Sequence, residues 1–253
     1  MNLHAEASGR GRPLVLLHGW GFHSGIWGGL AERLARGRRL IRVDLPGHGH
    51  SADSDFASLD GLVDDIAAAI PDEALVAGWS LGGLAALRLA TRHRAKVRAL
   101  ALIASTPCFA ARVGWDHGIA PAVLADFARD LKADPRATLV RFVRLNAVAA
   151  NGSRDAIRAL ERSLAERAGP SRAALDAGLE VLGASDLRSD AAAIGVPALV
   201  IHGARDRIVP VGAGRWLARS LRAARLVELP AAAHLPFISE PEAVAAALEQ
   251  FDA

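Results

Sequence analysis

The feature that most constrains the chain is the pentapeptide at residues 78–82, Gly-Trp-Ser-Leu-Gly, which fits the pattern G-x-S-x-G. An apolar run precedes it at residues 74–77, and an alanine- and leucine-rich run follows at 84–87. This context predicts a strand, a sharp turn carrying Ser80, and then a helix. A serine on such a turn has a strained backbone and an exposed Oγ, and glycines must flank it because side chains there would collide with the strand and the helix. The pattern indicates a nucleophilic serine, and an ordinary glycine-rich connection is the alternative.

Short β-branched or leucine-rich runs alternate along the chain with longer amphipathic runs. We expect strands at residues 14–17, 40–43, 74–77, 97–103, 198–201 and 226–229, and helices at 58–70, 81–93, 211–221 and 241–251. Strands that alternate with helices imply a parallel sheet, so the fold class is α/β. A chain of 253 residues favours one large α/β domain, or one domain with an insertion, over two independent domains.

The strand signal disappears between residue 109 and about residue 190. This stretch predicts several helices, at residues 121–131, 135–149, 154–168 and 171–182. A helical insertion after one strand of a parallel sheet is most simply a cap over the carboxyl edge of the sheet, where open α/β folds place their ligands. We therefore expect a core formed by residues 1–108 and 191–253, with a cap at 109–190. A second helical domain packed elsewhere is the alternative.

A nucleophilic serine needs a base to accept its proton and a third group to orient that base. Asp206 follows the apolar run at 198–201, and His234 follows the next one at 226–229. The chain order Ser80, Asp206, His234 is the order expected when the three side chains converge at the carboxyl edge of an α/β-hydrolase sheet. The sequence therefore predicts a catalytic triad of these residues.

The tetrahedral intermediate of acyl transfer also needs hydrogen-bond donors for its oxyanion. The first strand ends in Leu-His-Gly-Trp-Gly at residues 17–21, which is similar to the H-G-x loop of this fold. We assign the backbone N–H groups of Trp20 and Leu81 to the oxyanion hole. His18 lies within the same turn, where a structural hydrogen bond to the backbone is expected rather than acid–base work.

Other features limit the classes of function. The segment at 44–51 places His48 and His50 in a turn, where we expect structural or solvent-facing roles, and no histidine–carboxylate cluster has metal spacing. Serine acyl transfer needs no cofactor. A net charge of +3 without a basic run between aromatics does not indicate nucleic-acid binding. The single cysteine, Cys108, is expected to be a buried packing residue in a reducing compartment.

The location expected from the sequence is the cytoplasm. No apolar stretch approaches the roughly 20 residues that span a bilayer, so we expect no membrane association. The first residues lack a basic segment followed by an apolar one, so nothing indicates export. We expect a monomer.

Motifs spread over nearly the whole chain narrow the family. They lie at residues 16–21, 43–47, 78–84, 104–109, 178–182, 186–188 and 232–239. In these residues the chain resembles the carboxylesterases of biotin synthesis that cleave the methyl ester of pimeloyl-[acyl-carrier protein]. Trp20, Trp79 and the Ser-x-Pro-Cys-Phe run at 105–109 distinguish this family from other esterases better than the triad does.

The resemblance implies that the acyl chain enters a cleft between core and cap and that basic cap residues hold the acidic carrier protein. Substrate would contact Trp20, Ser80, Leu81 and His234, with Phe142 and Asn146 from the cap. The carrier protein would dock on Arg136, Arg141, Arg154, Arg158 and Arg162.

The charge pattern of the cap fits this expectation. Eight arginines but only three acidic residues lie between residues 136 and 172. Arg154, Arg158 and Arg162 are spaced to share one helical face, where they could bind phosphate and carboxylates together. A solvated face, with Arg162 paired to Glu166, is the alternative.

The activity implied is hydrolysis of the methyl ester to free pimeloyl-[acyl-carrier protein] and methanol. A broad short-chain carboxylesterase, or a serine carbon–carbon bond hydrolase of the same fold, is the alternative among enzymes, because one fold hosts many reactions. A non-catalytic protein that binds a small molecule under the cap is the alternative outside enzymes.

Overall fold

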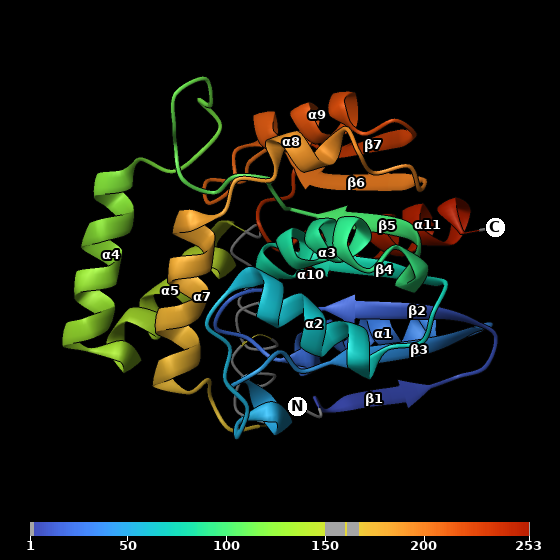
Figure 1. Ribbon diagram of the computed structural model, residues 1–253, viewed down its shortest axis with the longest axis horizontal. Coiled ribbons are helices and arrows are strands. Elements are labelled where there is room, and N and C mark those ends of the chain that lie inside the picture. Colours follow the sequence, from blue (N-terminus) through green and yellow to red (C-terminus); the bar gives the residue numbers. More distant parts are fainter. Residues whose placement is uncertain (1–2, 150–159, 161–166, 253) are drawn as a thin grey trace.

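The protein is built around one seven-stranded sheet. The computed structural model describes residues 3–149, 160 and 167–252 (Figure 1). The strands follow the order β1-β3-β2-β4-β5-β6-β7 across the sheet. They are β1 (Ala5–Ser8), β2 (Arg12–Leu17), β3 (Arg38–Val43), β4 (Ala74–Trp79), β5 (Val97–Ile103), β6 (Ala198–Gly203) and β7 (Ala224–Leu229). Neighbouring strands pair parallel, except that β1 pairs antiparallel with β3.

The sequence predicted six of these strands, and the structure confirms all six as a parallel sheet. The strand that it missed, β1, has the sequence Ala-Glu-Ala-Ser and lies at the edge of the sheet with its residues partly or fully exposed. Its pairing with β3, from Ala5 opposite Val43 to Ser8 opposite Leu40, is a long-range contact that no local pattern in the sequence indicates.

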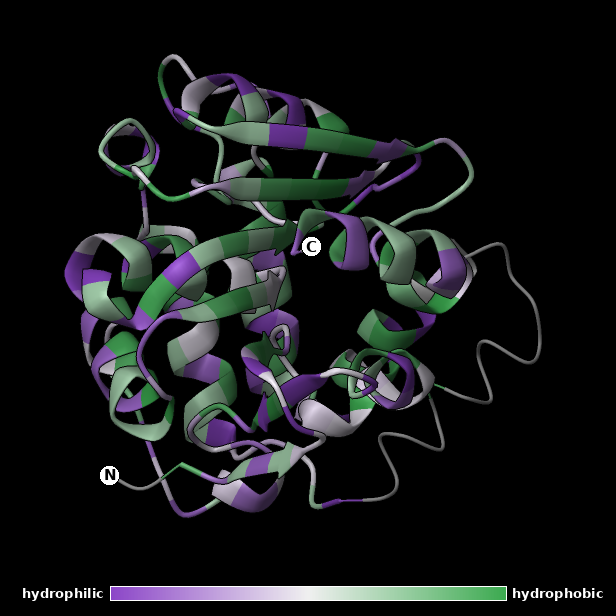
Figure 2. Cartoon of the chain, turned by 90° about the vertical axis from the view of Figure 1, so that its right-hand side faces the viewer, coloured by the Kyte–Doolittle hydropathy of each residue, from purple (hydrophilic) through white to green (hydrophobic). Residues whose placement is uncertain are grey.

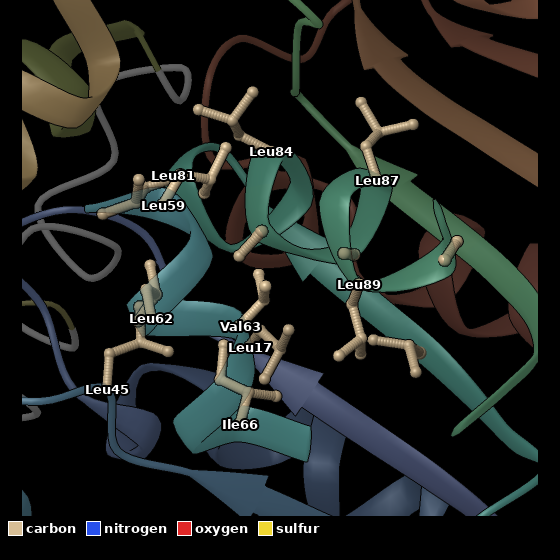
Figure 3. Packing of buried hydrophobic residues seen from close by; sticks show 14 of the residues in the cluster. Leu17, Leu45, Leu59, Leu62, Val63, Ile66, Leu81, Leu84, Leu87 and Leu89 are labelled. Carbon is tan, nitrogen blue, oxygen red and sulfur yellow. The ribbon is translucent and has the colours of Figure 1, made fainter. Parts of the chain in front are cut away.

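Alternate residues of the strands form two hydrophobic cores, one on each face of the sheet, as the two-residue period of a strand requires. Val15 and Leu17 pack in the core with α2 (Leu59–Ala69), α3 (Leu81–Arg92) and α9 (Val211–Ser220). Figure 3 shows the packing of α2 and α3 within this core.

Leu14 and Leu16 point to the opposite core, which is covered by α1 (Gly28–Leu34) and α11 (Pro241–Phe251). Figure 2 shows that the strands of the central sheet are largely hydrophobic. The helices predicted at 58–70, 81–93, 211–221 and 241–251 are confirmed, with Ser58 capping the first through its side chain.

Short elements complete this part of the chain. They are the 3₁₀ turns η1 (Ser24–Trp27), η2 (Gly49–Ser51) and η3 (Arg94–Lys96), and the short helices α8 (Arg188–Ala191) and α10 (Pro236–Ser239).

Among the described residues between β5 and β6, the stretch 104–120 is not helical and the chain from residue 121 onward is mainly helical. It forms α4 (Pro121–Ala133), α5 (Pro135–Ala149) and α7 (Arg172–Ala184), which lie together beyond the carboxyl ends of the strands (Figure 1). The predicted helices at 121–131, 135–149 and 171–182 are therefore confirmed. The one predicted at 154–168 falls almost wholly outside the described residues.

Candidate active site

Ser80 lies on a strained turn between β4 and α3. Its backbone has φ 54° and ψ −116°, a conformation that side-chain-bearing residues rarely adopt. The turn is also tightly packed, because a Cβ on Gly78 would lie 2.2 Å from the Gly82 carbonyl oxygen, and one on Gly82 would lie 2.3 Å from that of Leu17. Only glycine fits at both positions. The fold therefore keeps Ser80 at the carboxyl edge of the sheet at the cost of local strain, which is the geometry expected of a nucleophile.

Asp206 lies in the loop after β6 and accepts hydrogen bonds at both carboxylate oxygens. Its Oδ1 accepts the backbone N–H groups of Ile208 and Val209, both at 2.9 Å, while Oδ2 accepts Nδ1 of His234 at 2.8 Å. Burial penalises the carboxylate, but the charge of His234 and the hydrogen bonds from His202 and His234 outweigh that penalty. They hold the pKa of Asp206 well below its usual range. Asp206 is therefore ionised and acts only as an acceptor.

His234 lies between β7 and α10 and is completely buried. Because the Asp206 carboxylate can only accept, Nδ1 of His234 carries the proton, and Nε2 is left with a lone pair. Nε2 has no hydrogen-bond partner among the residues that the structure describes. The Trp79 indole Nε1–H donates to the His234 carbonyl oxygen at 2.8 Å, and the two rings lie 5.5 Å apart. The histidine loop is thus bound to the residue directly before Ser80.

The two residues assigned to the oxyanion hole come from the loop after β2 and from the start of α3. Leu81 is the first residue of α3, so its N–H has no acceptor within the helix. Trp20 lies in the loop after β2. A Cβ on Gly82 would lie 2.3 Å from the Leu17 carbonyl oxygen and 2.6 Å from that of His18, so that loop packs directly against the start of α3.

The Trp20 side chain links this loop to the helices between β5 and β6. Its Nε1–H donates to the Leu175 carbonyl oxygen at 2.9 Å, and its ring packs edge-on against Phe127 at 5.5 Å and Phe142 at 5.1 Å. Phe142, which the resemblance assigns to substrate contact, is therefore a neighbour of Trp20. Asn146 lies in α5, and its side chain falls outside the described part of the structure.

His18 and His48 are structural, as predicted. His18 Nδ1 donates to the Gly19 carbonyl oxygen, and Nε2 accepts the Leu45 N–H, both at 2.9 Å. Burial, with the nearby charge of His48, lowers the pKa of His18 to about 3. Burial likewise lowers the pKa of His48 to about 4, and its Nδ1 bonds the Pro46 carbonyl oxygen. Both rings are neutral at neutral pH. His50 is exposed, as was also expected.

The sequence analysis missed His202, at the end of β6. This buried ring places Nε2 2.9 Å from the Val209 carbonyl oxygen and 3.5 Å from Asp206 Oδ2. His202 therefore closes the loop that carries Asp206. Its place four residues before that aspartate was the available signal, but a single buried histidine has no periodicity that reveals its partner.

The arginines assigned to carrier-protein docking fall into two groups. Arg136 and Arg141 lie exposed on α5, where Arg141 forms an ion pair with Asp130 of α4 at 2.7 Å. Arg154, Arg158 and Arg162 lie outside the described residues.

The excess of positive charge is smaller in the structure than the count along the sequence indicates. Arg172 pairs with Asp176 at 2.6 Å, and Arg167 reaches Asp44 at 2.8 Å. Carboxylates from neighbouring elements, which the count over 136–172 missed, neutralise part of that charge.

Cys108 is fully buried, and its Sγ lies 3.2 Å from the Ala110 carbonyl oxygen, which confirms the packing role expected for it. Burial, followed by the charge of Asp186, raises the pKa of this thiol.

A cavity of about 610 Å³ lies between α4 and α7. Its apolar lining includes Leu124 and Leu179, but not Ser80, Asp206 or His234, so the cavity does not mark the nucleophile.

Within the described ranges, no cluster of His, Cys, Asp and Glu is arranged to hold a metal ion. None of the described helices has the length and apolar character needed to cross a membrane.

The sheet, the strained serine and the buried Asp206–His234 pair are the features expected of a serine hydrolase of the α/β class. A model of the alpha/beta hydrolase family matches residues 14–247. An esterase from Exiguobacterium antarcticum has the same fold, with a TM-score of 0.89 at 23% identity over 99% of this chain and 96% of that one. The predicted α/β-hydrolase fold is therefore confirmed.

Curated relatives narrow the class. A protein from Nitrosomonas europaea named pimeloyl-[acyl-carrier protein] methyl ester esterase is 43% identical, over 95% of this chain and 96% of its own length. Proteins of the same name from Aeromonas hydrophila subsp. hydrophila, at 41% over 99% of each chain, and Chromobacterium violaceum, at 42% over 99% and 98%, are also similar. The chain belongs to the pimeloyl-[acyl-carrier protein] methyl ester esterase family of alpha/beta hydrolases.

Proposed function

We propose that this protein hydrolyses the methyl ester of pimeloyl-[acyl-carrier protein], releasing methanol and free pimeloyl-[acyl-carrier protein] for biotin synthesis. The observation that carries the proposal is the end-to-end similarity, at 41–43% identity, to several relatives of that name. The hydrogen bond between the ionised Asp206 and the buried His234, together with the strained backbone of Ser80, supports the chemistry. We expect the protein to act as a monomer in the cytoplasm.

The reaction begins when Ser80 Oγ attacks the ester carbonyl carbon and its proton passes to Nε2 of His234. Asp206 Oδ2 keeps the other ring proton on Nδ1 and stabilises the imidazolium that forms. The N–H groups of Trp20 and Leu81 donate to the oxyanion. Collapse of the intermediate transfers the Nε2 proton to the departing methoxide, so methanol leaves and an acyl-serine remains.

Hydrolysis of the acyl-serine repeats these steps with water. His234 removes a proton from water, the hydroxide adds to the acyl carbon, and Ser80 leaves with the proton returned by the imidazolium. The free acid remains attached to its carrier protein. All proton transfers use chain residues and water.

Substrate binding follows from the position of α4, α5 and α7 over the carboxyl ends of the strands. We propose that residues 109–190 form a cap and that the acyl chain runs beneath it past Phe142 and Asn146. The exposed Arg136 and Arg141 of α5, with Arg154, Arg158 and Arg162 farther along the chain, would receive the acidic carrier protein. Phe142 packs against Trp20, which joins the acyl path to the oxyanion loop.

A direct test compares the wild-type protein with Ser80→Ala on three substrates: the carrier-protein methyl ester, a p-nitrophenyl ester and a ring-fission diketone. We expect the carrier-protein ester to have the highest kcat/KM and Ser80→Ala to abolish its cleavage while remaining folded. Higher kcat/KM on small esters or on the diketone would instead favour a broad esterase or a carbon–carbon hydrolase. Restored growth without biotin in a strain lacking this esterase would support the assignment in cells.

Docking is tested separately with Arg136→Glu. Reversing an exposed charge should lower kcat/KM about fivefold for the carrier-protein ester, leave small esters unaffected, and lose its effect at high salt. Arg219→Glu is the matched control, because it makes the same charge change on the exposed surface of α9. Equal losses on both substrates would contradict docking at Arg136.

A further inference from the structure

The loop that carries Trp20 is held at both ends by the chain after β3. At one end, His18 Nε2 accepts the Leu45 N–H. At the other end, the Ser24 N–H donates to Asp44 Oδ1 at 2.7 Å. The position of the Trp20 N–H therefore depends on the segment that begins at Asp44.

Asp44 is a fully buried carboxylate that needs a cation. Besides the Ser24 N–H, it accepts the His50 N–H at 2.9 Å through Oδ2. Burial opposes its ionisation, but the charge of His18 and these hydrogen bonds lower the pKa of Asp44 to about 2, so the group is charged at neutral pH. A buried charge without a partner is strongly destabilising, so the identity of its counterion is important.

The counterion is Arg167, which lies just before α7 and far from Asp44 in sequence. Its Nη1 donates to Asp44 Oδ2 at 2.8 Å and to Ser24 Oγ at 2.7 Å, and its Nη2 lies 3.2 Å from Glu6 Oε2. Only 11% of the Arg167 side chain is exposed. One guanidinium group thus spans Asp44 and Ser24, the two residues that fix the far end of the Trp20 loop.

Neighbouring contacts join the same two regions. The Ser171 N–H donates to the Gly47 carbonyl oxygen at 2.7 Å, and a Cβ on Gly47 would lie 2.3 Å from the Cβ of Ala174. A little farther along α7, Leu175 accepts the indole N–H of Trp20. Arg167, Ser171, Ala174 and Leu175 therefore contact the two loops that shape the oxyanion side of the site, and Arg167 supplies the charged contact.

We propose that Arg167 is a positioning residue for catalysis, which fixes the Trp20 loop through Asp44 and Ser24 and so sets the direction of the Trp20 N–H. This role rests on the proposed function, because it requires that N–H to bind the oxyanion. Arg167 touches neither substrate nor the reacting atoms. A displaced donor loses part of the stabilisation of the transition state, whereas binding of the ground-state ester depends on it much less.

The test is steady-state hydrolysis of p-nitrophenyl acetate by Arg167→Met, Arg167→Lys and the control Arg172→Met. Arg172 is the first residue of α7, and its exposed side chain pairs with Asp176 of the same helix rather than with Asp44. We expect Arg167→Met to lower kcat about tenfold with KM changed less than twofold, the signature of an interaction made in the transition state. Arg167→Lys should give an intermediate kcat, because an ammonium keeps the charge but lacks the guanidinium fork. Arg172→Met should match the wild type.

The affinity of a boronic acid that mimics the tetrahedral intermediate should weaken in parallel with kcat, since it uses the same donors. Circular dichroism and thermal unfolding restrict the comparison to temperatures at which each variant is folded. If Arg167→Met does not fold, Arg167→Lys carries the test. Folded Arg167 variants with wild-type kcat and inhibitor affinity would overturn the inference and leave Arg167 a purely structural residue. A wild-type protein without esterase activity would refute the proposed function instead.

Discussion

The substitution Asp206→Asn tests the proposed roles of Asp206 and His234 most sharply, because the structure dictates how the new amide must lie. Two backbone N–H groups, from Ile208 and Val209, point at Oδ1. The amide oxygen must take that position, since an NH₂ group there would face two donors. The amide NH₂ is then directed at Nδ1 of His234, where the wild-type carboxylate accepts a hydrogen bond.

The consequence is a reversed tautomer of the histidine. Facing a donor, Nδ1 of His234 must become an acceptor, so the ring proton moves to Nε2, which can then no longer take the proton of Ser80. Loss of the correct tautomer in a serine triad costs about 10⁴-fold in kcat, which corresponds to about 5 kcal/mol of barrier. Asn is close in size to Asp and keeps the two backbone hydrogen bonds, so we expect the fold to be retained.

The assay is kcat on p-nitrophenyl acetate, with thermal unfolding to confirm the fold. Asp176→Asn is the matched control, because it makes the same chemical change at an exposed ion pair on α7 and should leave kcat unchanged. A folded Asp206→Asn variant with kcat within tenfold of the wild type would refute the reasoning, since the base would then not depend on this carboxylate.

Two further predictions follow from packing and burial. Gly82→Ala should abolish activity and lower the melting temperature, because its Cβ would lie only 2.3 Å from the Leu17 carbonyl oxygen. The control is Gly29→Ala in α1, whose Cβ meets nothing within 4 Å, and this variant should be neutral or slightly stabilising. Urea unfolding should show that the free energy of unfolding decreases as the pH falls from about 6.5 to about 4, by roughly 1 kcal/mol per pH unit for each histidine. In the unfolded chain, His18 and His48 bind protons with the ordinary pKa of 6.5. In the folded protein, burial lowers the pKa of these rings to about 3 and about 4, so they stay neutral over this range. His48→Gln should flatten this pH dependence, and an unchanged profile would contradict the assignment.

The parts of the fold that the sequence predicts are those with local causes. The apolar runs of the parallel strands are visible because strands buried on both faces lack polar residues. The turn at Ser80 is visible because its geometry excludes any residue but glycine at Gly78 and Gly82. The edge strand β1 lacks both signals, since its register depends on β3 alone.

The parts of the site that the sequence could not predict depend on contacts between distant residues. Charge counting included Arg167 only among the arginines that make the cap basic, but the structure buries it against Asp44, which lies 123 residues earlier. His202 was overlooked for the same reason, because its partner is the Val209 carbonyl on the far side of a loop. Sequence spacing identifies residue types at strand ends, but it does not identify the counterion of a buried carboxylate.

The bond from Trp79 to the His234 carbonyl has a consequence for how such enzymes diverge. The loop bearing the base is bound to a side chain of the sheet itself, and Phe237 packs against the same indole at 5.3 Å. The loop bearing Trp20 is bound instead to α7. Replacing the helices between β5 and β6 with those of a related enzyme would therefore perturb the Trp20 loop, which stabilises developing negative charge, far more than it would perturb His234. New substrate ranges can thus evolve while the groups that transfer protons are inherited unchanged.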